Sequence, residues 1–579
     1  MKVNDLQQLL TNKNLDGFVF SISDEYLNEY VPECNNRIAY ITNFTGSFGV
    51  LIVLANSACL FVDSRYTLAA KQQVDLSTIE VNLFSKENVS NWLKSKLGNT
   101  KANIAFNAKI TSFSGFKMYK NWLENLGMQA TLIDYHLVDE IWENRPSKPA
   151  TPVYLHDTKY GSLDYKTKIK NIALELEKSN LDAFLITALD SIAWLLNIRG
   201  NDIPCNPLSL SKLIITKAGK VSWFIDKEKV ENIQKLLPEV DFYNESELEN
   251  FLKNNPQNIA AFGLSNNSPI YYYNLLQNNF KVVLKEDFCV NAKAVKNPNE
   301  VNSIKQAHIR DGAYLCKLYY ELYQNPIAFN EISIDTRLTE LKQDDKLFIG
   351  ESFPSIVGVD SNGAIVHYRA TTSSSKNLTA NSYLLLDCGS QYLDGTTDIT
   401  RTFSFNQVSE DFKKHYTLVL KGHIALATLL FKKGATGGHI DAFARKPLWE
   451  NGLDYGHGTG HGIGFFLCVH EGPQSISPFN NIELKEGMII SNEPGFYLEN
   501  QYGIRLENLY VVKKSSFDNF FCLENLTLAP FDIKNIDFSL LTSLEIEWLE
   551  KYHKEVYQKI SPYLNTLEQN WLKDFMNIN

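Results

Sequence analysis

The hydrophobic pattern of the first 150 residues alternates between helical and extended segments. Leucines recur at helical spacing within residues 4–13. A continuous apolar run at 17–21 then predicts a buried strand, and the apolar block at 50–62 predicts two more. A polar, proline-containing segment at 144–152 predicts a linker. Because helices and strands alternate, the pattern indicates an α/β domain.

A similar pattern returns after the linker. The segment NLDGFVFS at 14–21 matches NLDAFLIT at 180–187, and each copy follows an amphipathic helical stretch. The segment FVD at 61–63 is matched by FID at 224–226. Because the order and the offset of the two matches agree, we expect two related α/β domains in tandem.

A third unit begins near residue 293. The segment KNPNE at 296–300 predicts the capped start of a helix that continues to about residue 323. Near the C-terminus, apolar residues every four positions predict an amphipathic helix that covers the third domain or a partner subunit. That face comprises Leu544, Trp548, Tyr552, Val556 and Ile560. The predicted organisation is domains at 1–150, 151–292 and 293–515, with an extension at 516–579 packed on the third domain.

Composition and charge narrow the class of protein. The chain has 579 residues, of which 44% are apolar and 21% charged, as in ordinary globular proteins. The net charge of −10 and the lack of a basic run disfavour nucleic acid as a partner. The N-terminus lacks an apolar signal-peptide core, and the run at 48–62 is too short to span a bilayer. Eight scattered cysteines without a CxxC pair indicate reduced thiols, so we expect a cytoplasmic protein without membrane segments.

The stretch YGHGTGHGIGFFLCVHEGP at 455–473 concentrates candidate chemistry. It carries His457, His461 and His470 among six glycines, a composition that predicts a strand or loop with projecting imidazoles rather than a helix. The alternative is a loop with solvent-exposed histidines, which the acidic segments on either side disfavour. Histidine is the commonest metal ligand, and hard divalent cations also need carboxylate oxygens.

Four carboxylates lie at the ends of predicted strands. A strand ends at Asp387 and the next begins at Asp398, so that a hairpin would set the two side by side. Glu493 ends a later strand, and Arg505 and Glu507 would share one face of another. Each acid alone is more often a surface charge, but adjacent carboxylates repel unless a cation neutralises them or one is protonated. The whole set predicts a carboxylate-bridged pair of Mn, Co, Zn or Fe ions.

These motifs resemble the dinuclear pita-bread metallopeptidases of family M24, which include methionine aminopeptidase, prolidase and aminopeptidase P. The superfamily motifs are Asp387, Asp398, HGTGHGIG at 457–464, NEPG at 492–495 and IRLEN at 504–508. Further motifs resemble the long, three-domain aminopeptidase P: FTGSFG at 44–49, DSRY at 63–66, AWLLNIRGNDIPCNP at 193–207, ESFPSIVG at 351–358 and DGTTDITRTF at 394–403. The resemblance covers almost the whole chain. It implies two creatinase/prolidase N-terminal-like α/β domains followed by an α+β pita-bread catalytic domain.

The resemblance also implies a ligand set for two divalent metal ions, expected to be Mn(II), with Zn or Co as alternatives. Asp398 and Glu507 would bridge the ions. Asp387 would bind one ion, and His461 with Glu493 would bind the other. A homodimer is expected by the same analogy.

The implied activity is removal of the first residue from peptides with proline in second position. Hydroxide formed between the metals would attack the first peptide bond, while Glu493 carries a proton to the leaving nitrogen. His470 would stabilise the oxyanion. The residues expected to contact substrate or line its pocket are His367, His457, His470, Tyr497 and Arg505. Two alternatives stay open: a prolidase, which cleaves dipeptides, and a non-catalytic pita-bread module that binds peptides or histones.

Overall fold

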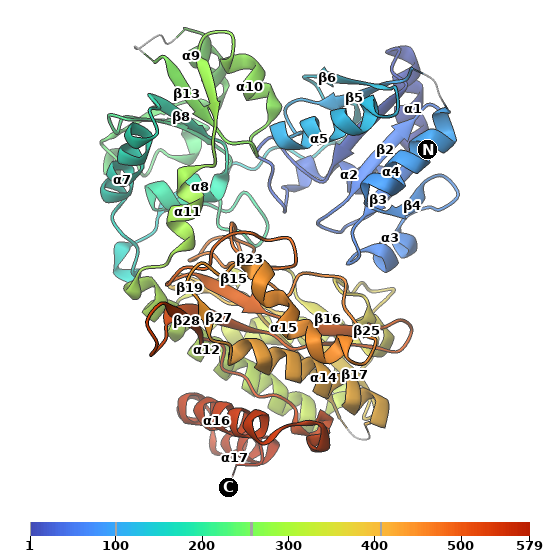
Figure 1. The fold of residues 1–579 in the computed structure, drawn as a ribbon, viewed down its shortest axis with the longest axis vertical. Coiled ribbons are helices and arrows are strands. Elements are labelled where there is room, and N and C mark those ends of the chain that lie inside the picture. Colours follow the sequence, from blue (N-terminus) through green and yellow to red (C-terminus); the bar gives the residue numbers. More distant parts are fainter. Residues whose placement is uncertain (1, 99–100, 255–258, 406–407, 579) are drawn as a thin grey trace. The chain divides into compact units, whose positions relative to one another are not determined.

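The structure is a computed structural model that describes residues 2–98, 101–254, 259–405 and 408–578 (Figure 1). It consists of two compact units. The first comprises Met1–His156 and Leu163–Val290, and the second comprises Asp157–Ser162 and Asn291–Asn579. Among the described residues, no helix is both long enough and apolar enough to cross a membrane.

The first unit contains two six-stranded sheets with the same topology. The first sheet has the order β4-β3-β2-β1-β5-β6 and the second the order β12-β11-β10-β8-β13-β14. In the first sheet β2 pairs antiparallel with β1 and β3, and in the second sheet β10 pairs antiparallel with β8 and β11. The remaining strand pairs of both sheets are parallel. The prediction of two related α/β domains is therefore confirmed.

The strands of the first sheet are β1 (Gly17–Ser21), β2 (Val50–Leu54), β3 (Ser57–Val62), β4 (Glu80–Leu83), β5 (Asn103–Asn107) and β6 (Gln129–Ile133). Those of the second are β8 (Ala183–Ile186), β10 (Lys212–Thr216), β11 (Val221–Phe224), β12 (Val240–Tyr243), β13 (Ala261–Leu264) and β14 (Lys281–Leu284). The helices of the first unit are α1 (Lys2–Asn12), α2 (Arg37–Thr42), α3 (Thr67–Gln73), α4 (Lys86–Leu97), α5 (Phe113–Glu124), α6 (Leu137–Ile141), α7 (Tyr165–Lys178), α8 (Leu189–Leu196), α9 (Leu248–Asn254) and α10 (Ile270–Leu276).

The repeated NLD segments have the same structural role in both domains. Asn14 and Asn180 each adopt the left-handed conformation, with φ of 55° and 53°, which lets the chain turn from a helix into the first strand. Asp16 then accepts a hydrogen bond of 2.6 Å from a backbone N–H at the start of β5. Asp182 accepts one of 2.9 Å at the start of β13. The repeat is visible in the sequence because these side chains fix the entry into each sheet.

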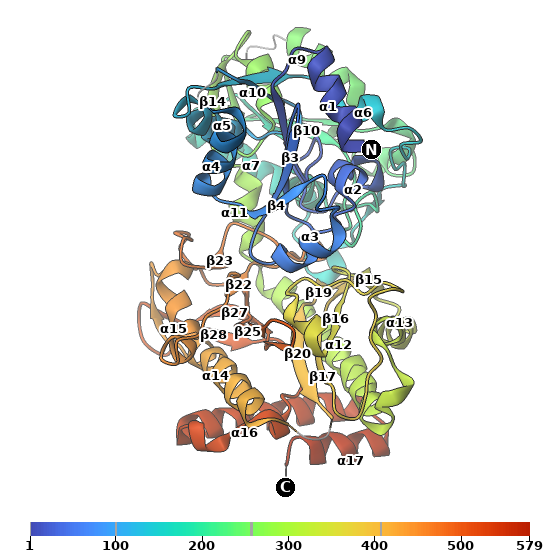
Figure 2. The same cartoon turned by 90° about the vertical axis from the view of Figure 1, so that its right-hand side faces the viewer.

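The second unit packs short sheets between helices. A three-stranded sheet comprises β16 (Ile356–Val359), β17 (Tyr383–Cys388) and β20 (Ile399–Ser404), and a four-stranded sheet comprises β21 (Phe431–Lys432), β28 (Phe520–Asn525), β27 (Asn508–Lys514) and β24 (Ile489–Asn492). Smaller sheets pair β15 (Phe348–Glu351), β18 (Ser390–Tyr392) and β19 (Gly395–Thr396), β22 (Gly460–His461) with β23 (Ser475–Ile476), and β25 (Gly495–Leu498) with β26 (Tyr502–Arg505). Within this unit, Figure 2 shows α13 on one side of these strands and α14 and α15 on the other.

Helices of the second unit follow their sequence signals. They are α12 (Pro298–Gln324), α13 (Glu331–Lys342), α14 (Glu410–Ala427), α15 (Gly437–Trp449), α16 (Ser543–Ile560) and α17 (Thr566–Phe575), and α11 (Phe288–Ala294) lies at the junction of the two units. The predicted start of α12 is confirmed, because Asn297 and Glu300 form a capping box around Pro298.

The predicted apolar face of α16 is wrong at its first position. Leu544 is 78% exposed, whereas Tyr552, Val556 and Ile560 are buried in the core of the second unit. A strict four-residue spacing drifts around a helix of 3.6 residues per turn, so Leu544 lies far from the face of Ile560. The buried stripe instead includes Leu549. The helix packs on the third domain, which is one of the two predicted arrangements.

Candidate metal centre

The two aspartates lie on neighbouring strands of one sheet. β17 and β20 pair antiparallel, with Asp387 opposite Thr400 and Cys388 opposite Ile399. Asp398 directly precedes β20, and both aspartates are buried. The expected antiparallel pairing therefore forms and brings the two carboxylates to the same end of the sheet, but it is not a simple hairpin, because β18 and β19 lie between the two strands in the chain.

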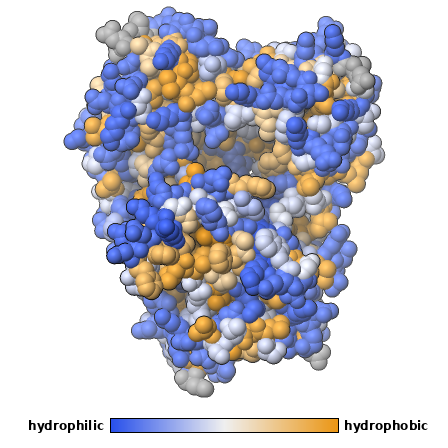
Figure 3. Space-filling model, in the orientation of Figure 1, coloured by the Kyte–Doolittle hydropathy of each residue, from blue (hydrophilic) through white to orange (hydrophobic). Residues whose placement is uncertain are grey.

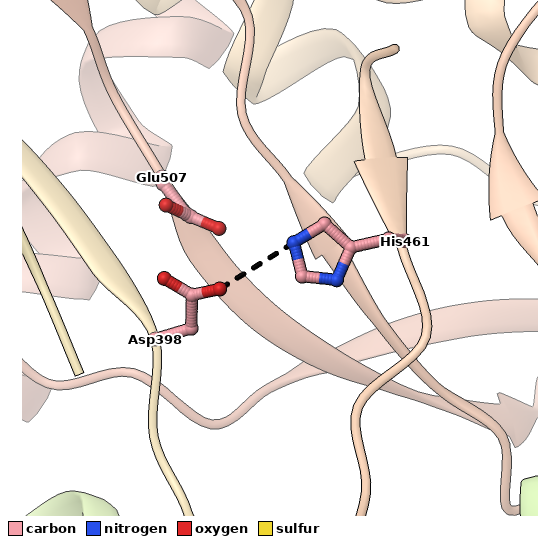
Figure 4. A group of neighbouring side chains, drawn as sticks. All are labelled: Asp398, His461 and Glu507. Carbon is pink, nitrogen blue, oxygen red and sulfur yellow. Dashed lines mark ion pairs between the residues drawn. The ribbon is translucent and has the colours of Figure 1, made fainter. Parts of the chain in front are cut away.

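The histidine and the first glutamate approach from the other sheets. His461 lies in β22, and its backbone N–H donates to Ser491 Oγ at 2.8 Å. The same hydroxyl donates to Glu493 Oε1 at 3.1 Å, so Ser491 holds both segments together. His461 Nε2 lies 3.4 Å from Asp398 Oδ2 and 3.5 Å from Glu493 Oε1. In Figure 4, Asp398, Glu507 and His461 point toward a common space.

The atoms that face this space are suited to bind cations. The ligand atoms of Asp398, His461 and Glu507 all lie within 4.8 Å of one another. His461 Nδ1 contacts the Gly462 carbonyl at 3.0 Å, so Nδ1 carries a proton and Nε2 is the ring nitrogen that faces the carboxylates. Asp387 Oδ1 and Glu507 Oε1 are buried without a hydrogen-bond partner among the described residues. Carboxylate oxygens and an imidazole nitrogen that converge on one space fit a site for divalent metal ions.

The electrostatics of the cluster favour added positive charge. Burial, together with the charge of Asp387, raises the pKa of Asp398 to about 6. Burial, followed by the charges of Asp398 and Glu493, raises the pKa of Glu507 well above its usual value. Burial alone would lower the pKa of His461, but Asp398 and Glu493 outweigh it and raise this pKa to about 9. Without metal the cluster therefore retains protons, which bound cations would displace.

Thr400 connects the ligands to the surrounding hydrogen bonds. Its Oγ1 donates to Glu507 Oε2 at 2.8 Å and accepts from Arg505 Nε at 3.1 Å. Arg505 Nη2 donates to Asp387 Oδ2 at 2.6 Å. Thr400 was not among the predicted site residues, although its position two residues after Asp398 places it on the same face of an extended strand.

The prediction that Arg505 and Glu507 share one strand is wrong. β26 ends at Arg505 and β27 begins at Asn508. Between them the backbone changes partners, because Leu506 N–H donates to the Pro494 carbonyl at 3.2 Å and Glu507 N–H donates to the Thr400 carbonyl at 3.0 Å. Both side chains nevertheless reach the Thr400 hydroxyl.

A chain of hydrogen bonds continues from Arg505 to His457. Arg505 Nη1 donates to the Tyr497 hydroxyl at 2.6 Å. His457 Nδ1 contacts the Gly458 carbonyl at 2.8 Å, so its Nε2 accepts from the Tyr497 hydroxyl, also at 2.8 Å. Burial raises the pKa of Tyr497 to about 12, although Arg505 opposes the shift. Tyr497 therefore stays protonated and holds His457 in one tautomer.

The remaining two histidines lie on separate segments. His470 stands edge-on to His461, with ring centroids 4.4 Å apart. His367 is half-buried and follows a short 3-10 helix, Asp360–Ala364, that packs against β26. This packing is close, because a Cβ at Gly503 would lie 1.8 Å from the Gly363 carbonyl oxygen.

Comparisons with known proteins agree with this geometry. The model of metallopeptidase family M24 matches residues 302–514, and its C-terminal region matches 519–576. Creatinase/prolidase N-terminal domains match 2–141 and 144–300. A Laccaria bicolor protein named probable Xaa-Pro aminopeptidase P is 34% identical, over 98% of this chain and 92% of its own. A Coprinopsis cinerea protein of the same name is 35% identical, over 98% of this chain and 96% of its own.

The chain belongs to metallopeptidase family M24. Among solved M24 structures, the X-prolyl aminopeptidase of Caenorhabditis elegans superposes with a TM-score of 0.94 at 31% identity, over 99% of this chain and 98% of its own. That protein is described as a cytosolic enzyme with a dinuclear active site. The Xaa-Pro dipeptidase of Bacillus anthracis, at 23% identity and a TM-score of 0.53, covers only 64% of this chain. The M24 fold with two creatinase-type N-terminal domains, expected from the motifs, is confirmed.

A Thr400→Val variant tests the hydrogen bonds behind the ligands. Valine keeps the size of the side chain but removes the hydroxyl that binds Glu507 and Arg505. Because partners of metal ligands typically contribute about 10–100-fold in metal affinity, we expect a loss of that order in Mn(II) affinity measured by calorimetry. Thr336→Val, at an exposed helical position, is the matched control and should bind metal normally. Unchanged affinity in Thr400→Val would show that the hydroxyl does not orient Glu507.

Proposed function

We propose that this chain is a dinuclear Xaa-Pro aminopeptidase, which releases the first residue of a peptide when proline stands second. The observation that carries the proposal is the convergence of His461 Nε2 with the carboxylates of Asp398 and Glu507 in a chain whose full-length relatives are named Xaa-Pro aminopeptidase P. Burial and neighbouring carboxylates raise the pKa of Asp398 and Glu507, so bound cations would stabilise their charged forms.

The proposed ligands are Asp387, Asp398, His461, Glu493 and Glu507, with Asp398 and Glu507 shared by two ions. Mn(II) is the proposed metal, with Zn or Co as alternatives, because the donor set has four carboxylates and one imidazole. When bound, the two cations supply Lewis acidity that activates water and polarises the scissile carbonyl.

The protein's own side chains handle the protons and the developing charge. In the overall hydrolysis, water adds its oxygen to the carbonyl carbon as the C–N bond breaks. Glu493 takes a proton from the water and passes it to the leaving proline nitrogen. The His470 ring lies edge-on to the His461 ring, with 4.4 Å between the centroids, and donates a hydrogen bond to the oxyanion. His457 and Arg505, linked through Tyr497, orient the substrate.

Two rival functions predict different substrates. A prolidase would hydrolyse Xaa-Pro dipeptides, but the dipeptidase neighbour covers 64% of this chain while matching 99% of its own, so it lacks a counterpart for much of the longer chain. A non-catalytic binding module would not require a complete ligand set. Hydrolysis of Arg-Pro-Pro that stops on chelation and returns with Mn(II) supports the aminopeptidase. Cleavage of dipeptides alone would favour prolidase, and binding without turnover would favour the module.

We further propose the domain limits 1–150, 151–292, 293–515 and 516–579, a cytoplasmic location and a homodimer. The eight cysteines are scattered along the sequence without a CxxC pair, in keeping with a reducing compartment. In the view of Figure 3, hydrophobic residues gather around the position of α15. This helix exposes Phe443 and Trp449, and such apolar surface is typical of a protein interface. Light scattering that gives the mass of one chain would contradict the dimer.

Removal of a bridging carboxylate should abolish activity. We expect Asp398→Ala and Glu507→Ala to retain the fold but lose measurable turnover and at least one bound metal, because four carboxylates share the cations. Glu499→Ala removes an exposed carboxylate from the same part of the chain and should behave as wild type. Circular dichroism, metal analysis and Arg-Pro-Pro hydrolysis measure the three properties. Near-normal turnover with two bound metals in either bridging variant would refute the assignment.

Selectivity for proline should appear as a kinetic penalty for alanine in second position. A pocket made by His367, Tyr497 and apolar neighbours accepts a proline ring, which brings no N–H. A secondary amide would bury an unpaired donor, which costs about 1–3 kcal/mol. Since ~1.4 kcal/mol is tenfold in rate, we expect kcat/KM for Arg-Ala-Pro to be at least about tenfold below that for Arg-Pro-Pro.

The same comparison tests His367. His367→Ala should reduce the preference for proline more than it changes metal content, whereas His439→Ala, at an exposed position, should change neither. Equal rates of the wild type on the two peptides would sink the proline-specific assignment and indicate a broader metallo-aminopeptidase.

A further inference from the structure

The loop at 462–474, between β22 and β23, carries His470 and is closed on itself. Gly462 N–H donates to the Gln474 carbonyl at 3.1 Å, and Glu471 N–H donates to the Gly462 carbonyl at 2.8 Å. Five apolar side chains of the loop are buried, namely Ile463, Phe465, Phe466, Leu467 and Val469. His470 is therefore attached to a loop with a defined conformation.

Glu471, the next residue after His470, anchors this loop through a buried cluster of charges. Its side chain is inaccessible to solvent, and so are most atoms of the two lysines that reach it. Lys296 donates to Oε1, and Lys293 Nζ lies 3.2 Å from Oε2. Lys293 belongs to α11, and Lys296 follows it in the short connection to α12. The backbone N–H of Lys296 is itself fixed, donating to the Gly487 carbonyl at 2.9 Å.

A second buried side chain, that of Gln391, connects the loop to the strands between Asp387 and Asp398. Gln391 in β18 donates from Nε2 to the Leu467 carbonyl at 2.7 Å. Its Oε1 accepts from Thr396 Oγ1 at 2.8 Å, so the amide orientation is set. β18 and β19 lie between Asp387 and Asp398 in the chain. The loop of His470 is thus tied both to the segment before α12 and to the strands between the two aspartates.

This arrangement is better suited to positioning than to stability. Buried ion pairs often contribute little net stability, because desolvation offsets the attraction between the charges. Displacing one charge from its partners in a medium of low polarity is nevertheless costly, which restricts where the attached backbone can lie. Because Glu471 adjoins His470, the restriction acts on the imidazole next to His461.

We propose that Glu471 is a positioning residue for catalysis: its ion pairs with Lys293 and Lys296 hold the His470 imidazole where it meets the developing oxyanion. The proposal rests on the proposed function of His470. It assigns no contact with substrate or metal to Glu471 itself. Since misplacement by about 1 Å can cost on the order of 100-fold in rate, a modest shift of the loop is enough to be measured.

A double-mutant cycle tests the proposal on the metal-loaded full-length chain with Arg-Pro-Pro. We expect His470→Ala and Glu471→Gln each to lower kcat by roughly 10–100-fold, with metal content retained and KM changed by less than about threefold. If Glu471 acts through His470, the double variant falls no more than about twofold below His470→Ala alone. Multiplicative losses in the double variant, or wild-type kcat in Glu471→Gln, would overturn the proposal.

Two further variants keep the test decisive. Glu486→Gln replaces an exposed glutamate that pairs with Lys514 at 3.2 Å, and it should match wild type. If Glu471→Gln does not fold, Lys296→Met removes one partner of the same carboxylate and enters the cycle in its place, with the same expected non-additivity. A wild type inactive on Arg-Pro-Pro would refute the proposed function. An active wild type whose His470→Ala variant loses rate while the cycle is additive would refute only the role of Glu471.

Discussion

The second unit is arranged around one electrostatic constraint: buried carboxylates that face one another must share positive charge. Asp398 and Glu507 are almost inaccessible to solvent and meet across the same space as His461. Burial raises the pKa of both carboxyls, aided by the charge of Asp387 at Asp398 and by the charges of Asp398 and Glu493 at Glu507, so the cluster binds protons in the absence of cations. A site of this kind is costly to maintain unless metals are its normal occupants.

The constraint fits the origin of the proposed ligands in several short sheets. Asp387 lies in β17, Asp398 directly precedes β20, His461 lies in β22, Glu493 follows β24, and Glu507 precedes β27. Hydroxyls fix these segments relative to one another, since Thr400 binds Glu507 and Ser491 binds both His461 and Glu493. Such partners orient metal ligands and are a regular part of metal sites.

Features of the fold could be predicted where a short sequence pattern arises from contacts between residues close in the chain. The NLD repeat predicted two related domains because Asn14 and Asn180 make the same left-handed turn. The position of Asp387 and Asp398 at neighbouring strand ends could be predicted because apolar residues in the strand before Asp387 and in the strand after Asp398 mark the two paired segments. Thr400 could have been found by alternation along the strand that begins near Asp398.

Other features depend on contacts between distant residues and could not be predicted from the sequence. Lys296 and Glu471 are 175 positions apart, and no local spacing relates them. Arg505 ends β26, whereas Glu507 lies between β26 and β27, where its N–H donates to the distant Thr400 carbonyl. Leu544 is exposed because helical geometry departs from an exact four-residue repeat.

Proton release on metal binding tests most directly whether cations neutralise this cluster. Mn(II) would be titrated into metal-free protein at pH 7 by calorimetry in buffers of different ionisation enthalpy. His461, with a pKa of about 9, holds a proton at that pH, and burial shifts the pKa of Glu507 upward as well. The account predicts that two ions bind per chain and release at least about one proton. Binding without proton release, or no binding of Mn(II), Zn(II) or Co(II), would contradict it.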